Sequence, residues 1–237
     1  MPKKAAPKAR RARAVRHRED GAATRARIVK ASLKLIRKRG FDATTMRAIA
    51  EAAEVSLGLA YHYFPSKEAI VLSYYEMLQT GFARRVEQDM PKIKSLAARV
   101  QAVLEFRMEE LARDRELFIA LSRVALDPTN PLAVFSDETS KVREEAIATM
   151  RIVVDHPDVP AELRDAAASA LWAFTMTFVI AVLFDKSKDQ ARARMLAALV
   201  GQALPMLISS VSGEDAAPMR AMITGALAVT GLLPAPR

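Results

Sequence analysis

The stretch from Thr45 to Pro65 constrains the fold more than any other part of the sequence. Thr45 and Ser56 are both good helix N-caps, and Pro65 ends the second segment because the residue before a proline avoids the helical region. Each predicted helix is short, and the second runs from Leu57 to about Tyr63. Helices of this length are not stable alone in water, so neighbouring helices must hold them. The pattern predicts a helix-turn-helix arrangement.

Longer helices are predicted on both sides of this stretch. The first begins after Gly21, where Thr24 can cap it, and it ends at Gly40, because glycine readily adopts the left-handed conformation that follows a helix. Ser66 caps the fourth helix. The expected units are a disordered basic tail at 1–20, a helix-turn-helix unit at 21–67 and a helical body at 68–237.

The rest of the chain reads as helix, interrupted by prolines and a glycine. No segment shows the bounded alternation of apolar and polar residues that is typical of a strand. The predicted fold class is therefore all-α, with a helical bundle after the amino-terminal domain. The further helices are expected at roughly 95–113, 115–126, 138–154, 161–184, 188–211 and 215–230.

Positive charge is concentrated at the amino end of the chain. The whole sequence carries a net charge of +9, of which residues 1–67 carry +12 and the remainder −3. A basic unit on a nearly neutral body favours a polyanionic partner. The tail could be a simple solvated segment or an arm that binds phosphates without sequence preference. No apolar run follows it, as a secretory signal would require, and there is no cysteine, so we expect a cytoplasmic protein.

Catalytic and metal chemistry is not indicated. The histidines His17, His62 and His156 lack the spacing of a metal site, and there is no glycine-rich phosphate loop. The adjacent pairs Glu109–Glu110 and Glu144–Glu145 point in different directions on a helix and are interpreted as solvated surface. We therefore expect no enzyme activity, no metal and no cofactor.

Two uncharged segments, 166–184 and 195–213, permit two interpretations. With the basic link between them they could form a membrane hairpin, since a spanning helix needs about 20 apolar residues. They equally suit helices that are buried on all sides. The first segment opens with weakly apolar residues and the second contains Gln202 and Pro205, which favours the buried helices.

The stretch from residue 24 to about residue 70 resembles the amino-terminal domain of TetR-family repressors. Three positions depart from the family pattern: Glu54 replaces a glycine, Leu57 a polar residue and Ala60 a leucine. The residues that match the pattern are Thr45, Arg47, Ile49, Ala50, Ala53, Val55, Ser56, Gly58, Tyr61, Tyr63, Phe64, Ser66, Lys67 and Glu68.

The resemblance implies that the second short helix lies in the major groove of DNA. Leu57 and Leu59 would face thymine methyl groups, although one of them could instead pack against the first helix. Thr45 and Ser56 could contact phosphate at their helix N-termini or act only as caps. Candidate DNA-binding residues are Thr45, Ser56, Leu57, Gly58, Leu59, Tyr61, His62, Tyr63 and Lys67.

The resemblance also implies a repressor that binds an inverted repeat as a homodimer and is released by a small molecule. Helices near 161–184 and 188–211 would form the dimer interface. The ligand is expected to be apolar, because the aromatic and methionine residues of the body dominate any lining. The candidate pocket residues, each also suited to plain core packing, are Phe106, Phe118, Trp172 and Met176.

Overall fold

The computed structural model describes the backbone of residues 7–229 and the side chains of residues 21–213 and 215–228. This part of the chain is helical and contains no strand, which confirms the all-α prediction. Short 3₁₀ turns at Met90–Lys92, Ala161–Leu163, Lys188–Gln190 and Glu214–Ala216 link some of the helices. The α-helices are α1 (Pro7–Arg39), α2 (Met46–Ala52), α3 (Leu57–Tyr63), α4 (Lys67–Asp89), α5 (Leu96–Ala112), α6 (Arg115–Ala125), α7 (Ser140–Val154), α8 (Arg164–Phe184), α9 (Ala191–Val211) and α10 (Ala217–Val229).

The chain forms two compact units, which we call unit 1 and unit 2. The division falls after Tyr74, inside α4. The boundary expected from the sequence, after Lys67, lies at the start of the same helix. Each unit has a hydrophobic core of its own.

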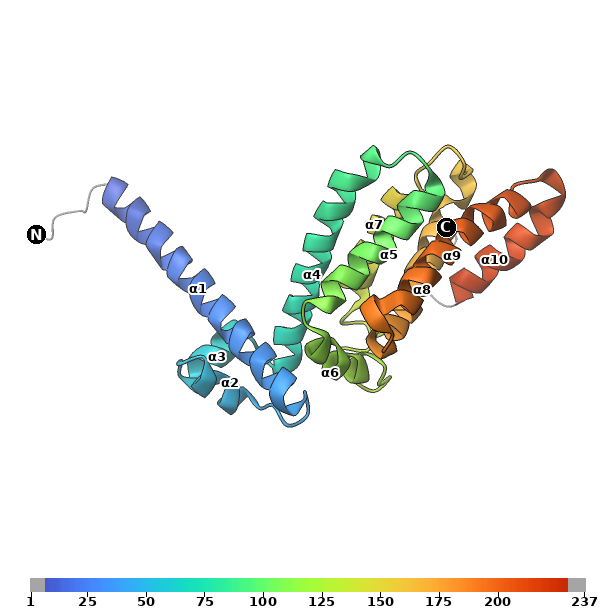
Figure 1. Cartoon of the computed structure of the whole chain (residues 1–237). Coiled ribbons are helices and arrows are strands. Elements are labelled where there is room, and N and C mark those ends of the chain that lie inside the picture. Colours follow the sequence, from blue (N-terminus) through green and yellow to red (C-terminus); the bar gives the residue numbers. More distant parts are fainter. Residues whose placement is uncertain (1–6, 230–237) are drawn as a thin grey trace, which may run out of the picture. The chain divides into compact units, whose positions relative to one another are not determined.

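In unit 1, the short helices α2 and α3 lie against the carboxyl-terminal part of α1 (Figure 1). The predicted N-caps are confirmed: the Thr45 hydroxyl accepts a hydrogen bond from the Ala48 N–H at 3.3 Å, and the Ser56 hydroxyl accepts one from the Leu59 N–H at 3.1 Å. The helices share one apolar core, which is what keeps such short elements folded. That core is made of Ile28, Ala31, Met46, Ile49, Ala50, Ala53, Ala60, Phe64 and Ile70.

The start of α1 differs from the prediction. The helix begins at Pro7 and continues through Gly21, so Thr24 lies inside it and residues 7–20 are not irregular. Alanine and arginine on both sides of Gly21 are strong helix formers, and they offset the cost of about 1 kcal/mol for a glycine inside a helix. Proline is also well tolerated in the first turn of a helix. Residues 1–6 of the expected tail lie outside the described residues.

The turn between α2 and α3 has an unusual residue at its sharpest point. Glu54 adopts the left-handed conformation, with φ of 54°, at the position where the resemblance has glycine. The N–H of Glu54 donates to the Glu51 carbonyl at 3.1 Å, and the N–H of Val55 donates to the Ala50 carbonyl at 3.0 Å. This pattern is a Schellman motif, which favours glycine because a Cβ atom is strained there.

In unit 2, α5 is the central helix and packs against α7, α8 and α9 (Figure 1). Its contact with α9 is particularly close. A Cβ atom at Gly201 of α9 would lie only 2.8 Å from the Ala97 carbonyl oxygen of α5. Any larger residue at this position would force the two helices apart, so a residue without a side chain is needed here.

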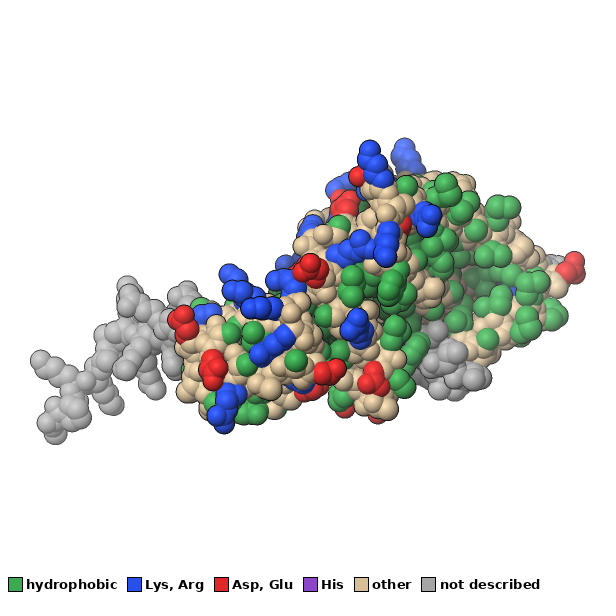
Figure 2. All heavy atoms as spheres, turned by 60° about the horizontal axis from the view of Figure 1, so that its bottom comes forward, with side chains coloured by type: hydrophobic (Ala, Val, Ile, Leu, Met, Phe, Trp, Pro, Cys, Tyr) green, Lys and Arg blue, Asp and Glu red, His purple; other side chains and the backbone are tan. Residues whose placement is uncertain are grey.

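The two apolar segments form α8 and α9, with their preceding turns. Ala161–Phe184 and Lys188–Val211 are long and apolar enough to cross a membrane, with mean hydropathies of 2.0 and 1.4. Half of the first window is buried inside unit 2, as expected for a core helix, but only 17% of the second. Figure 2 shows hydrophobic side chains gathered over the carboxyl-terminal helices. The exposed large apolar residues on α9 and α10 are Met195, Leu199, Met206, Leu207, Met219, Met222 and Ile223.

Replacing Glu54 with glycine should stabilise unit 1 by about 1 kcal/mol, because it removes the strain of a left-handed non-glycine residue. Amide hydrogen exchange over residues 46–64 should slow about fivefold. The matched control is Glu51→Gly, which places a glycine inside α2 and should speed the same exchange. Equal or faster exchange in the Glu54→Gly protein would contradict this interpretation of the turn.

Candidate nucleic-acid interface and ligand cavity

Helix α3 has one buried side and one exposed side. Ala60 is fully buried and Phe64, just after the helix, is 2% exposed, so both hold α3 against the core of unit 1. On the opposite side, Leu59 is 39% exposed and Tyr61 48% exposed, and His62 is exposed as well. The outer side therefore presents an apolar group, a hydroxyl and an imidazole, which can all contact base edges or phosphates in a DNA groove.

Two other DNA-binding candidates on α3, Leu57 and Tyr63, are partly buried within unit 1. Leu57 is half-buried and packs against the unit 1 core, which includes Ile28 and Ala31 of α1, so a contact of Leu57 with thymine stays a prediction. The half-buried Tyr63 meets the ring of His62 edge-on, with centroids 5.4 Å apart. Its hydroxyl lies beside α1, 3.4 Å from where a Cβ atom of Gly21 would be.

The remaining candidates, at the start of α2 and of α3, lie at the surface of unit 1. Thr45, Ser56 and Gly58 are exposed, and a Cβ atom at Gly58 would have nothing within 4 Å. Open space beside Gly58 is compatible with a close approach of another backbone. The hydroxyls of Thr45 and Ser56 already act as caps, and a hydroxyl oxygen that accepts a hydrogen bond can still donate its own proton.

Lys67 is engaged within unit 1. Its ammonium donates to the carbonyl of Phe41 at 3.0 Å and to that of Asp42 at 3.5 Å, and it lies 4.2 Å from the centroid of the Phe41 ring. Lys67 thus ties the start of α4 to the loop between α1 and α2. A phosphate contact by Lys67 stays a prediction and would use its third donor.

The surface of unit 1 is mainly basic. Arg25 lies over the Phe64 ring at 4.7 Å, which keeps one positive charge beside the end of α3. Such charges attract the DNA backbone without sequence preference. The exposed arginines and lysines of the described side chains are Arg25, Arg27, Lys30, Lys34, Arg37, Lys38, Arg39 and Arg47.

Replacing Lys67 with methionine should loosen the loop between α1 and α2 even without DNA. A hydrogen bond from a charged donor contributes about 1.5–3 kcal/mol, so amide exchange near residues 40–46 should speed at least tenfold. Tyr61→Phe, which changes only the exposed side of α3, serves as the control and should leave this exchange unchanged. Unchanged exchange in the Lys67→Met protein would show that these contacts do not stabilise the loop.

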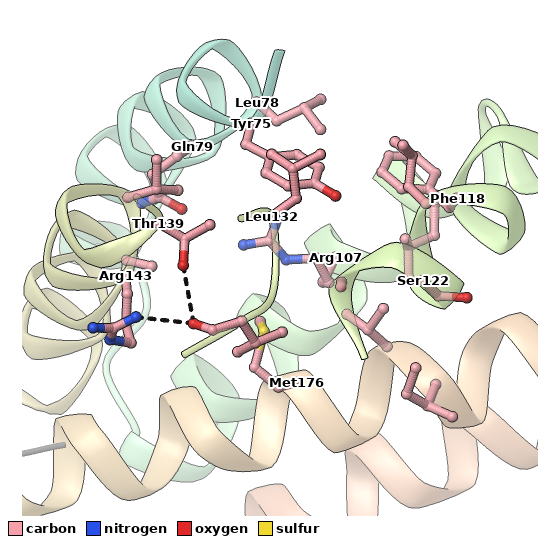
Figure 3. Close-up of a pocket in the computed structure, with 18 of the residues that line it drawn as sticks. Tyr75, Leu78, Gln79, Arg107, Phe118, Ser122, Leu132, Thr139, Arg143 and Met176 are labelled. Atoms are coloured by element: carbon pink, nitrogen blue, oxygen red, sulfur yellow. Dashed lines mark hydrogen bonds between the residues drawn. The ribbon is translucent and has the colours of Figure 1, made fainter. Parts of the chain in front are cut away.

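Unit 2 contains a cavity of about 240 Å³ between α4, α5, α6, α7 and α8 (Figure 3). Its lining is mostly aliphatic and aromatic. One wall is the segment between α6 and α7, where Thr139 and Arg143 both donate to the Val134 carbonyl, at 3.3 and 2.9 Å. Gln79 of α4 also lines it and donates to the Thr149 hydroxyl at 2.8 Å.

Three of the four pocket candidates line this cavity: Phe118, Trp172 and Met176. Phe106 does not. Its ring lies under the guanidinium of Arg85, 3.6 Å from ring centroid to guanidinium carbon. Adjacent residues of a helix point about 100° apart, so on α5 the ring of Phe106 packs beside Arg85 while the next residue, Arg107, lines the cavity.

Arg107 and Glu110 were not identified as cavity residues from the sequence. They form an ion pair whose side chains are only 12% and 15% exposed, which corrects the interpretation of Glu110 as solvated surface. Its neighbour Glu109 is exposed and pairs with Arg85 at 2.7 Å. The sequence contains one indication that Arg107 is buried. It follows Val100, Val103 and Leu104 at the helical spacing of the apolar stripe of α5, so it lies on the same side of the helix.

The described residues contain no cluster of three or more histidine, cysteine or carboxylate side chains that could hold a metal ion. The exposed side of α3 and the cavity of unit 2 are two candidate binding features.

Comparison with known proteins identifies the amino-terminal part of the chain. Residues 28–74 match the model for bacterial regulatory proteins of the tetR family. The HTH-type transcriptional repressor KstR of Rhodococcus jostii (strain RHA1) is 31% identical over 129 residues, which are 52% of this chain and 58% of that repressor.

Two solved structures of regulators named FadR share the fold. The Bacillus subtilis protein, in complex with stearoyl-CoA, gives a TM-score of 0.58 at 18% identity and covers 77% of this chain and 96% of its own. The Thermus thermophilus protein, a TetR-family repressor in complex with lauroyl-CoA, gives 0.52 at 22% identity and covers 75% and 93%. Residues 28–74 therefore form a domain of the bacterial regulatory proteins of the tetR family, and most of the chain shares the fold of these solved regulators.

Proposed function

We propose that this protein is a transcriptional repressor that binds an inverted-repeat operator as a homodimer and is released by a small ligand. The exposed side of α3 is the observation that carries the proposal. Leu59, Tyr61 and His62 project from a helix that is firmly seated through Ala60 and Phe64, on a unit whose surface is basic. Because a short helix makes few base contacts, most of its affinity for DNA must come from contacts with phosphates.

A dimer follows from the same reasoning, because one short α3 can contact few bases. Two copies related by a two-fold axis double the contacts and read an inverted repeat. The apolar side chains of α9 and α10 support this arrangement, since a contiguous exposed apolar patch is typical of an interaction site. Met206 is 73% exposed and Leu207 61% exposed. A two-fold interface would cover both, and it accounts for the apolarity of α9 without a bilayer.

The cavity is the proposed effector site. Tyr75, Leu78 and Gln79 of α4 line it, and the same helix begins at Lys67, directly after α3 and its proline turn. A ligand that favours a different position of α4 would therefore change the distance between the two copies of α3 on DNA. A coupling of about 1–3 kcal/mol is enough for partial release. The acyl-CoA complexes of the two FadR proteins support an effector with a long apolar part.

The DNA-binding proposal can be tested on duplexes selected from a random pool at low salt. We expect an inverted repeat, and log K should fall with log salt by about 0.9 for each phosphate contacted. Tyr61→Phe should weaken binding roughly tenfold on all duplexes, since each protomer loses one hydrogen bond. Leu59→Ser should instead change which bases are preferred, because it removes an apolar contact to thymine.

The control for Tyr61→Phe is Thr129→Val, which removes an exposed hydroxyl from unit 2 outside the cavity and should leave DNA affinity unaltered. A wild-type protein that shifts no duplex at low ionic strength would overturn the DNA-binding proposal.

The dimer can be tested separately by sedimentation velocity. Met206→Glu should weaken self-association at least tenfold, because two-fold symmetry places the new charge twice in an apolar interface. Met77→Glu is the matched control: Met77 is an exposed methionine, 58% accessible, on α4 rather than on α9 or α10. Equal association of both variants would place the interface elsewhere.

A further inference from the structure

The charge inside the unit 2 cavity does not balance. Its lining contains three ionisable groups that are charged at neutral pH: Arg107, Glu110 and Arg143. Two positive charges face one negative charge, so the lining carries a net charge of +1. The guanidinium of Arg143 binds the backbone carbonyls of Val134 and Ser136, at 2.9 and 3.3 Å, and no carboxylate of the described residues pairs with it.

Arg107 is the charged group least satisfied by the protein. It pairs with Glu110 through one terminal nitrogen, and its guanidinium carbon lies 3.7 Å from the centroid of the Phe82 ring. Its Nε is buried and has no hydrogen-bond partner among the described residues. A buried donor without a partner is costly, and a guanidinium is well suited to bind a carboxylate through two parallel hydrogen bonds.

The other lining residues favour an apolar part of the ligand rather than a charged one. Apart from the few polar groups, they are aliphatic or aromatic, and Figure 3 shows Phe118, Leu132 and Met176 among them. Ligand sites commonly combine such an apolar wall with a few polar groups that set orientation. The cavity therefore favours a molecule with an apolar body and a single anionic end.

We propose that the effector of this repressor is an amphipathic carboxylate, with its apolar chain among the aromatic residues and its carboxylate on Arg107. This deepens the proposed function and rests on the cavity being its effector site. A free carboxylate differs chemically from an acyl thioester, whose carbonyl carries no charge. The negative charges of an acyl-CoA lie on its phosphates, away from the acyl chain, whereas a free carboxylate places its charge at the end of the chain, where Arg107 lies.

The volume suggests a suitable probe. A cavity of about 240 Å³ has room for an apolar chain. Octanoate, 1-octanol and octylamine form a matched series of probes that differs only in the polar end. Trp172 lines the cavity and is the single tryptophan of the chain, so its fluorescence reports occupancy directly, without DNA.

Octanoate should bind the wild-type protein at least tenfold more tightly than octanol, and octylamine more weakly than either. Arg107→Met combined with Glu110→Met removes the ion pair without leaving a buried charge, a replacement that proteins usually tolerate. The carboxylate loses its donors on Arg107 in this double variant, so the preference for octanoate over octanol should fall at least fivefold, although Arg143 leaves the lining with a net charge of +1. Circular dichroism checks that it folds.

Arg85→Met is the matched control. Arg85 also lies over a phenylalanine ring and pairs with a glutamate between α4 and α5, but it does not line the cavity. This variant should keep the preference for octanoate. Equal binding of octanoate and octanol to the wild type, no response of Trp172 to any probe, or a preference that is unchanged in the double variant would overturn the proposal.

The release of DNA is measured apart from this, by titrating the protein–operator complex with octanoate. Octanoate that binds beside Trp172 but leaves the complex intact would overturn the effector role in the proposed function. The preference of the cavity for a carboxylate would stand in that case, because it is measured on the protein alone.

Discussion

Burial of Ala60 and Phe64 against α1 and α2 holds the seven-residue helix α3 in place. Such a helix has too few internal hydrogen bonds to persist in water, so its orientation is entirely a product of the core beneath it. The small size of Ala60 lets α3 lie close to its neighbours. With this side fixed, Leu59, Tyr61 and His62 can only face outward. A change in the core of unit 1 would therefore alter the surface that we propose for DNA binding.

Unit 2 depends on a different balance between apolar packing and a few buried charges. Gly201 allows α9 to approach α5 closely, and α5 in turn carries Arg107 into the cavity. Arg107 is only 12% exposed, and its ion pair with Glu110 offsets the cost of burying its charge. The Nε donor of Arg107 still has no partner among the described residues. Apolar residues at both positions would fill the same space without the cost of burying two charges. Their presence in an otherwise apolar lining is a reason to look for a ligand there.

Much of this organisation could be predicted from the sequence where the signals are local. Thr45, Ser56 and Pro65 mark the ends of short helices through interactions with their own neighbours, and the structure follows them closely. The start of α1 was predicted wrongly because Gly21 was interpreted as a boundary, although the surrounding alanines and arginines favour a continuous helix. Phe118, Trp172 and Met176 were suggested by residue type alone, and Phe106 looked equally suitable.

The sequence by itself determined the helical class, most helix ends and the basic character of the amino-terminal unit, because caps, prolines and charge act over a few residues. Only the tertiary structure decided which side of each helix is buried and what lies opposite it. Phe106 and Arg107 are adjacent, yet one lies under Arg85 and the other lines a cavity, according to the helices packed around α5. That choice depends on contacts between segments far apart in the chain, which local patterns do not encode.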